Sequence, residues 1–216
     1  SLFERFSLKK CSVEFVKFSF QFFYQKTNFW DSKRTLKTNK QMKRTPQLSS
    51  RNRYQAASDL TVQNQQMFEN AGNDVDPIKL EDPYDEIEYL KKLIDQSAEW
   101  DDQVAGMKRL MGLINGGALE NYQFRHDLPV IYPGCSAAVR NLRSALVKQA
   151  CLLICQMARE MDSSFDQIGD FISPLSTQLS HGTQIIAESC KFAILCIAKN
   201  CPSRRILTSI IDLAAK

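Results

Sequence analysis

Residues 141–158 read NLRSALVKQACLLICQMA, and their apolar residues recur every three or four positions. This spacing is typical of one face of an amphipathic α-helix. The apolar face of the predicted helix carries Leu142, Leu146, Ala150, Leu153, Ile154, Met157 and Met161. From Asp82 onward the sequence contains almost no strand pattern, and we therefore predict an all-α fold.

Upstream of this stretch the pattern predicts further helices. Pro83 suits a first helical turn, and a second helix with apolar positions from Val104 to Ile114 ends at Gly116-Gly117. Residues 124–131 then carry apolar residues at helical spacing and precede an expected break at Pro133-Gly134. The first two helices form a predicted helical hairpin.

Downstream the same arrangement returns. Residues 165–179 predict a helix that Pro174 kinks, and the segment Ser180-His181-Gly182 ends it. Its partner helix carries apolar or small residues on one side: Ile185, Ile186, Ser189, Cys190, Ala193, Cys196 and Ile197. The stretch from residue 206 to residue 215 indicates the start of another pair.

Equivalent turns between paired helices recur at a nearly constant distance. From Trp100 to Arg143 is 43 residues, and from Arg143 to Gln184 is 41. This period lies in the range of HEAT-type helical repeats, whose pairs stack into a solenoid with their turns along one edge. We predict an α-solenoid of about three antiparallel helix pairs plus a partial fourth, which continues beyond Lys216, and we expect a ligand at the turn edge.

Charge divides the chain into three parts. Residues 1–53 contain 13 Lys or Arg and 3 Asp or Glu, residues 54–102 contain 3 and 13, and residues 103–216 contain 12 and 8. We expect a basic, disordered leader at 1–53, a polar and acidic linker at 54–77 and the helical domain at 78–216. The leader is either an electrostatic tether to a polyanion or a solvated linker; its pairing with the acidic stretch 74–102 is a further hypothesis.

Several function classes find no support in the sequence. It contains no phosphate-binding loop or paired catalytic residues, so we expect neither an enzyme nor a cofactor. The 7 cysteines fit helix cores better than disulfides, and neither His126 nor His181 lies in a cluster with metal-ligand spacing. No run approaches the roughly 20 apolar residues of a membrane-spanning helix.

Two segments resemble a known family. EWDDQVAGMKRLMGLINGGA (residues 99–118), followed by NLRSALVKQACLLICQMA, is similar to the TOG domains of the CLASP (cytoplasmic linker-associated protein) family. The resemblance extends from about Ile78 to Lys216. It implies half of a six-repeat paddle that binds tubulin, stabilises microtubules and works in the cytoplasm on microtubules and the spindle.

The resemblance also implies site residues. Trp100 is the aromatic residue of the first turn that packs against tubulin, and Arg143 is the basic residue of the second turn. Arg140 and Lys148 near that turn favour encounter with acidic tubulin, and Gln184 occupies the third turn.

This chain departs from the family pattern at three positions. Gln103 stands where the family commonly has Arg, Asn141 replaces an acidic residue, and Gln184 replaces Lys. Trp100 could instead cap the core, and Arg143 could bond carbonyls of a neighbouring helix. The alternative function is a generic helical-repeat scaffold that binds other proteins, cytoskeletal ones among them, or nucleic acid through the leader.

Overall fold

A computed structural model describes residues 63–161, 166–201 and 203–215. The chain divides into two compact units, and Gln66–Leu213 forms the one described below. The expected leader at 1–53 lies outside the described residues. So does the Phe-rich start of the chain.

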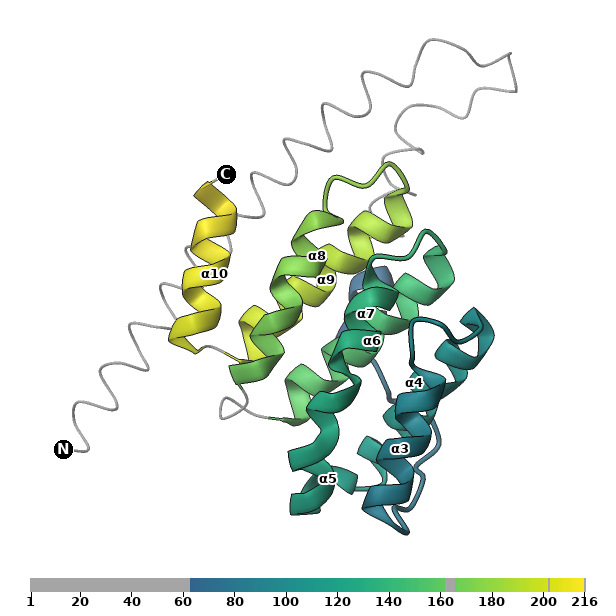
Figure 1. Cartoon of the computed structure of the whole chain (residues 1–216). Coiled ribbons are helices and arrows are strands. Elements are labelled where there is room, and N and C mark those ends of the chain that lie inside the picture. Colours follow the sequence, from purple (N-terminus) through teal and green to yellow (C-terminus); the bar gives the residue numbers. More distant parts are fainter. Residues whose placement is uncertain (1–62, 162–165, 202, 216) are drawn as a thin grey trace, which may run out of the picture. The chain divides into compact units, whose positions relative to one another are not determined.

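The described residues form helices and contain no strand, which confirms the all-α prediction (Figure 1). Consecutive helices pack as pairs: α3 with α4, α6 with α7, and α8 with α9. α10 follows α9 as the last described helix. The helices are α3 (Pro83–Leu93), α4 (Trp100–Asn115), η1 (Ala118–Glu120), α5 (Tyr122–Asp127), η2 (Leu128–Ile131), α6 (Tyr132–Val139), α7 (Ser144–Glu160), η3 (Asp166–Phe171), α8 (Ile172–Thr177), α9 (Gln184–Asn200) and α10 (Arg204–Ala215).

The second helices of the pairs stack on one another as a layer, the B layer. α7 packs between α4 and α9, and contacts between equivalent positions show that the three run parallel. Along α7 and α9, Cys151 Sγ lies 3.8 Å from Cys190 Sγ, and further along both helices Cys196 Sγ donates to the Cys155 carbonyl at 3.4 Å. Along α4 and α7, Gln149 Nε2 donates to Met111 Sδ at 3.1 Å, and further on Gln156 Nε2 donates to Asn115 Oδ1 at 2.7 Å. The N-terminal ends of α4, α7 and α9 therefore lie along one edge.

Local sequence explains where the first pair begins. The carboxylate of Asp82 accepts hydrogen bonds from the backbone N–H groups of Tyr84 at 2.8 Å and Asp85 at 3.1 Å. These groups have no partner within the helix, so this cap stabilises α3. Pro83 occupies the first turn, as predicted.

The structure differs from the sequence pattern at two breaks. Pro133 and Gly134 lie inside the first turn of α6 rather than between helices, because proline needs no N–H partner in a first turn. The single helix expected over 165–179 is split into η3 and α8 among its described residues, with Pro174 in the first turn of α8.

The first and the second helices of the pairs both contribute to the core. Leu90 of α3, Leu110 of α4 and Leu153 of α7 are fully buried, as is Phe171 beside α8. Residues 66–78, which the sequence places almost entirely in a linker, also pack on the B layer, and Phe68 is only 3% exposed. We call residues 66–78 the strap.

Candidate functional site

The turns that lead into α4, α7 and α9 form the candidate site. We call residues 94–100, 140–144 and 178–185 the turn edge. Because the three B-layer helices run parallel and pack in order, the turns at their N-terminal ends follow one another along the solenoid.

The structure brings together the two site residues that the resemblance predicts most directly. Trp100 is the first residue of α4 and is half-buried, and Arg143 is exposed at the N-cap of α7. The Arg143 guanidinium lies over the Trp100 ring, with its carbon 5.0 Å from the ring centroid. A cation–π contact of this kind contributes about 0.5–1 kcal/mol at an exposed site.

Each of these two turns is held by its own short polar side chain. In the second turn, Asn141 Oδ1 accepts a hydrogen bond from the Arg143 N–H at 2.9 Å. In the first turn, the Asp95 carboxylate accepts from the N–H of Ser97 at 2.8 Å and from its hydroxyl at 2.5 Å. These two bonds lower the pKa of Asp95, since they favour the ionised carboxylate.

Gln103, in the first turn of α4, is buried and supports the turn that precedes this helix. It is 5% exposed, and its Nε2 donates to the carbonyl of Ala98 at 2.8 Å. An arginine at this position would have to place its charge in the same buried space. The departure from the family pattern at Gln103 thus has a structural role in this chain.

The three remaining predicted residues lie at different places near the turns. Arg140 is exposed where α6 ends, and Lys148 is half-buried one turn into α7. Gln184 is exposed at the start of α9, and its Nε2 donates to the Glu188 carboxylate at 2.7 Å. That bond lies within α9, so it leaves the edge side of the third turn open.

Two exposed apolar residues on the turn edge were assigned by periodicity to buried helix faces, which is wrong. Leu142 is 83% exposed because α7 begins two residues later, at Ser144. Ile185, in the first turn of α9, is 54% exposed. The missed signal is their position immediately beside a helix start, where side chains lie outside the packed layer.

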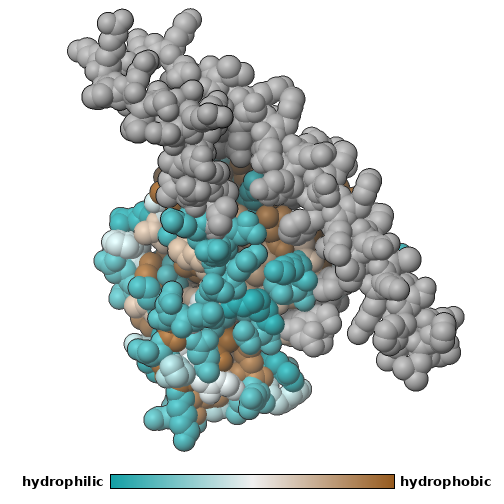
Figure 2. Space-filling view, turned by 180° about the vertical axis from the view of Figure 1, so that it is seen from behind, coloured by the Kyte–Doolittle hydropathy of each residue, from teal (hydrophilic) through white to brown (hydrophobic). Residues whose placement is uncertain are grey.

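The described surface is otherwise mixed. Figure 2 shows apolar residues among hydrophilic ones on the face that it views. The first turn and the start of α4 are acidic, with Glu99, Asp101 and Asp102 exposed next to Trp100 in the sequence, whereas the second turn carries Arg140 and Arg143.

In the described part of the chain, no three His, Cys, Asp or Glu side chains are grouped so that they could hold a metal ion. Cys135, Cys151, Cys155, Cys190 and Cys201 are buried, and burial raises the pKa of the Cys135 thiol to about 12. None of the helices in that part combines the length and the hydropathy needed to cross a bilayer.

Comparison with known proteins identifies relatives. A family model described as CLASP N terminal matches residues 86–216. The chain is 30% identical over 147 residues to the CLIP-associated protein of Arabidopsis thaliana, covering 65% of this chain and 10% of the relative. It is 25% identical over 148 residues to CLIP-associating protein 1-A of Xenopus laevis, with 66% and 10% covered. The chain thus spans about a tenth of the length of these relatives.

Proposed function

The chain belongs to the CLASP N-terminal family, and from this premise we propose that its turn edge binds tubulin. The protein would thereby associate with microtubules, regulate their stability and act in the cytoplasm on microtubules and the spindle. Binding, rather than catalysis, is the role we assign to the site residues.

The pair of Arg143 and Trp100 carries this proposal. Tryptophan and arginine are the residues that most often dominate the energy of protein interfaces. Here the stacking contact at 5.0 Å holds both side chains in one arrangement before a partner arrives. A partner therefore loses less side-chain entropy on binding them.

Exposed apolar side chains extend the binding surface along the edge. Leu142 adjoins Arg143 in the sequence and is 83% exposed, and Ile185 of the third turn is 54% exposed. Burial of such side chains against a partner contributes about 25 cal/mol per Å² of apolar surface. The basic Arg140, Arg143 and Lys148 complement the acidic surface of tubulin.

The acidic first turn favours the second candidate, a scaffold for a different protein partner. Glu99, Asp101 and Asp102 are exposed and flank Trp100 in the sequence, and they would repel an acidic surface placed directly against this turn. A partner of this second class would present basic groups to the first turn and acidic groups to the second.

Co-sedimentation of the full 216-residue chain with microtubules tests the proposal. We expect the double variant Trp100→Ala/Arg143→Ala to lose binding, because loss of interface anchors costs about 2 kcal/mol or more, which is roughly thirtyfold in Kd.

A matched control removes an exposed aromatic and an exposed arginine elsewhere. Tyr122 is 70% exposed and Arg125 is exposed in α5, which follows the opposite end of α4. The variant Tyr122→Ala/Arg125→Ala should bind as the unaltered chain does. Equal binding by all three proteins would refute the assignment of the turn edge, and no binding by the unaltered chain would refute the tubulin proposal.

A further inference from the structure

The strap (residues 66–78) contacts α4 and α7 at the ends opposite to the turn edge, and it contacts α9 at its middle and in its last turn. Its partners Asn115, Arg159 and Lys199 lie in the last turns of α4, α7 and α9 respectively. The strap therefore connects helices that belong to three successive repeats.

On α4 the strap is seated through its backbone. The N–H of Ile78 donates to the carbonyl of Gly112 at 2.8 Å, and Asn115 Nδ2 donates to the carbonyl of Gly72 at 2.7 Å. The strap lies so close to the end of α4 that a Cβ at Gly116 would collide with the carbonyl of Ile78. The sequence indicates Gly116 only as a helix stop.

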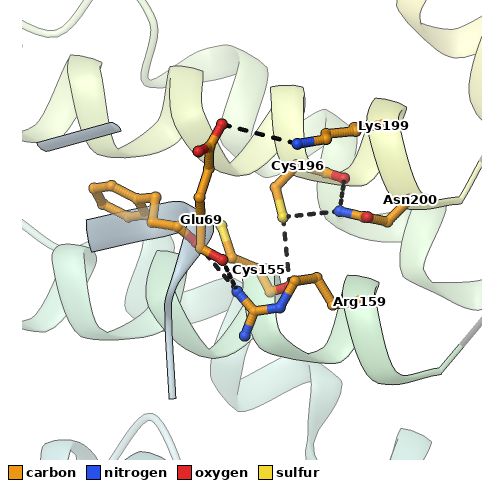
Figure 3. A network of polar contacts seen from close by, with 7 residues as sticks. Glu69, Cys155, Arg159, Cys196, Lys199 and Asn200 are labelled. Atoms are coloured by element: carbon orange, nitrogen blue, oxygen red, sulfur yellow. Dashed lines mark hydrogen bonds and ion pairs between the residues drawn. The ribbon is translucent and has the colours of Figure 1, made fainter. Parts of the chain in front are cut away.

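On α7 the strap is held by Arg159. A short helix covers residues 63–69, and its last carbonyls have no partners of their own within the helix. The Arg159 guanidinium donates to the carbonyls of Phe68, Glu69 and Ala71. Figure 3 shows Arg159 beside Glu69. A cation at a helix C-terminus also interacts favourably with the helix dipole.

Gly72 fits the strap to the same helix. Its φ of 92° lies in the left-handed region, where a side chain is strained. A Cβ there would lie 2.5 Å from Cδ of Gln156. Gln156 is 1% exposed and is itself fixed by hydrogen bonds from its Nε2 to the carbonyl of Met111 at 3.1 Å and to Oδ1 of Asn115 at 2.7 Å.

On α9 the contact is mainly apolar. The rings of Phe68 and Phe192 are stacked with centroids 5.4 Å apart, and both are buried. Lys199 Nζ lies 3.9 Å from the Glu69 carboxylate (Figure 3); this pair is exposed and contributes little.

Repeats in a solenoid ordinarily contact only their neighbours. In the B layer α4 packs on α7 and α7 packs on α9, so small rotations can accumulate from one repeat to the next. The strap contacts α4 and α9 at once and bridges the two outer helices of this set. The strap thus restrains the rotation of α4 relative to α9, which the packing of neighbouring helices alone restrains only weakly.

The length of the helices transmits this restraint to the turn edge. α4 has 16 residues and α7 has 17, so each is about 25 Å long. For a rod of that length, a rotation of about 5° at the strap end displaces the other end by about 2 Å. An interface of three successive turns is sensitive to displacements of that size.

We propose that the strap is a positioning element, which sets the spacing between the turns at Trp100, Arg143 and Gln184 and thereby the affinity of the turn edge for its partner. Arg159 and Gly72 are its positioning residues. The effect on affinity rests on the proposed tubulin binding, whereas the effect on spacing does not.

Double electron–electron resonance between nitroxide labels at residues 99 and 183 of the full chain measures the distance between the first and third turns. The labels are attached to genetically encoded p-acetylphenylalanine, since the chain contains 7 cysteines. We expect Gly72→Ala and Arg159→Ala to shift and broaden the distance distribution, and Arg159→Lys, which keeps a cation, to shift it less.

Two variants control for stability alone. Gly117 also has a positive φ, 83°, but a Cβ there would meet only Glu120 at ordinary contact distances. Arg109 also contacts a neighbouring element, through its Nε 2.6 Å from the Glu86 carboxylate, but within the first pair. Gly117→Ala and Arg109→Ala should leave the distance distribution unchanged.

The proposal is overturned if both strap variants keep the original distribution, or if the controls broaden it equally. Should Gly72→Ala fail to fold, Arg159→Ala decides the question, because Arg159 is partly exposed at a helix end. Microtubule co-sedimentation of the same proteins then tests the effect on affinity. Absence of binding by the unaltered chain would refute the proposed function alone, whereas equal affinity despite altered spacing would refute the strap's role in binding.

Discussion

The two ends of the B-layer helices differ in whether their side chains and backbone groups contact other parts of the chain or the solvent. At the strap end, backbone carbonyls accept hydrogen bonds from the Asn115 amide and the Arg159 guanidinium within the chain. At the turn edge, Leu142, Ile185 and the guanidinium of Arg143 are exposed to solvent. One end of these helices thus makes internal contacts, and the other end is available to a partner. We therefore expect substitutions at the strap end to change stability and substitutions at the turn edge to change binding.

The largest expected effect on stability is at Gly72. Gly72→Ala should lower the free energy of unfolding by about 2–5 kcal/mol, because the left-handed backbone costs about 1–2 kcal/mol with a side chain and overpacking against Gln156 costs about 1–3 kcal/mol. Urea denaturation followed by circular dichroism measures this. Gly117→Ala, which has the first cost without the second, should lose only about 1–2 kcal/mol; equal losses would mean that the strap's fit to α7 adds nothing.

A smaller effect, on binding alone, is expected at Leu142. Leu142→Asp should weaken microtubule binding by about 1–2 kcal/mol, roughly five- to thirtyfold in Kd, through lost apolar contact and a charge that opposes an acidic partner. Its free energy of unfolding should stay within about 0.5 kcal/mol of the original, since the residue is a surface position. A stability loss comparable to that of Gly72→Ala would contradict the division between the two ends.

The smallest effect concerns the pH dependence of the first turn. Hydrogen bonds from Ser97 lower the pKa of Asp95 below its ordinary value of 3.8. A carboxyl group with a lowered folded-state pKa adds stability above its unfolded pKa, and this stability is lost as the pH falls through the folded value. In an NMR titration, Ser97→Ala should raise the Asp95 pKa toward 3.8. The variant removes only the hydroxyl bond, since the N–H of residue 97 remains, so an unchanged pKa would show that this hydroxyl bond does not stabilise the ionised Asp95 carboxylate.

Much of the fold is predictable because its signals are local. Apolar spacing along the chain indicates the helices, and the distances of 43 and 41 residues between turns indicate the repeat. The equivalence of Trp100 and Arg143 in successive turns follows from that repeat and from the family resemblance. Their stacking at 5.0 Å requires the two turns to lie side by side, which the parallel packing of α4 and α7 provides.

The strap lies beyond what local patterns can predict. It lies almost entirely in the polar and acidic stretch that the sequence assigns to a linker. The relevant signals are Gly72 and Gly116, because the absence of a side chain allows another segment to approach closely. The sequence does not indicate which segment that is. Gly72 lies against Gln156, 84 positions away, and Gly116 against Ile78.

Local sequence patterns thus predict the helices, because hydrophobic spacing and capping act over a few residues. The distances between these patterns along the chain predict the repeat, and the residues in them identify the family. Only tertiary packing decides which residues of distant segments meet. It places Arg143 over Trp100 and buries Phe68 against Phe192. The physical reason is that burial depends on which distant surfaces meet, and that is a property of the stacked repeats rather than of any single segment.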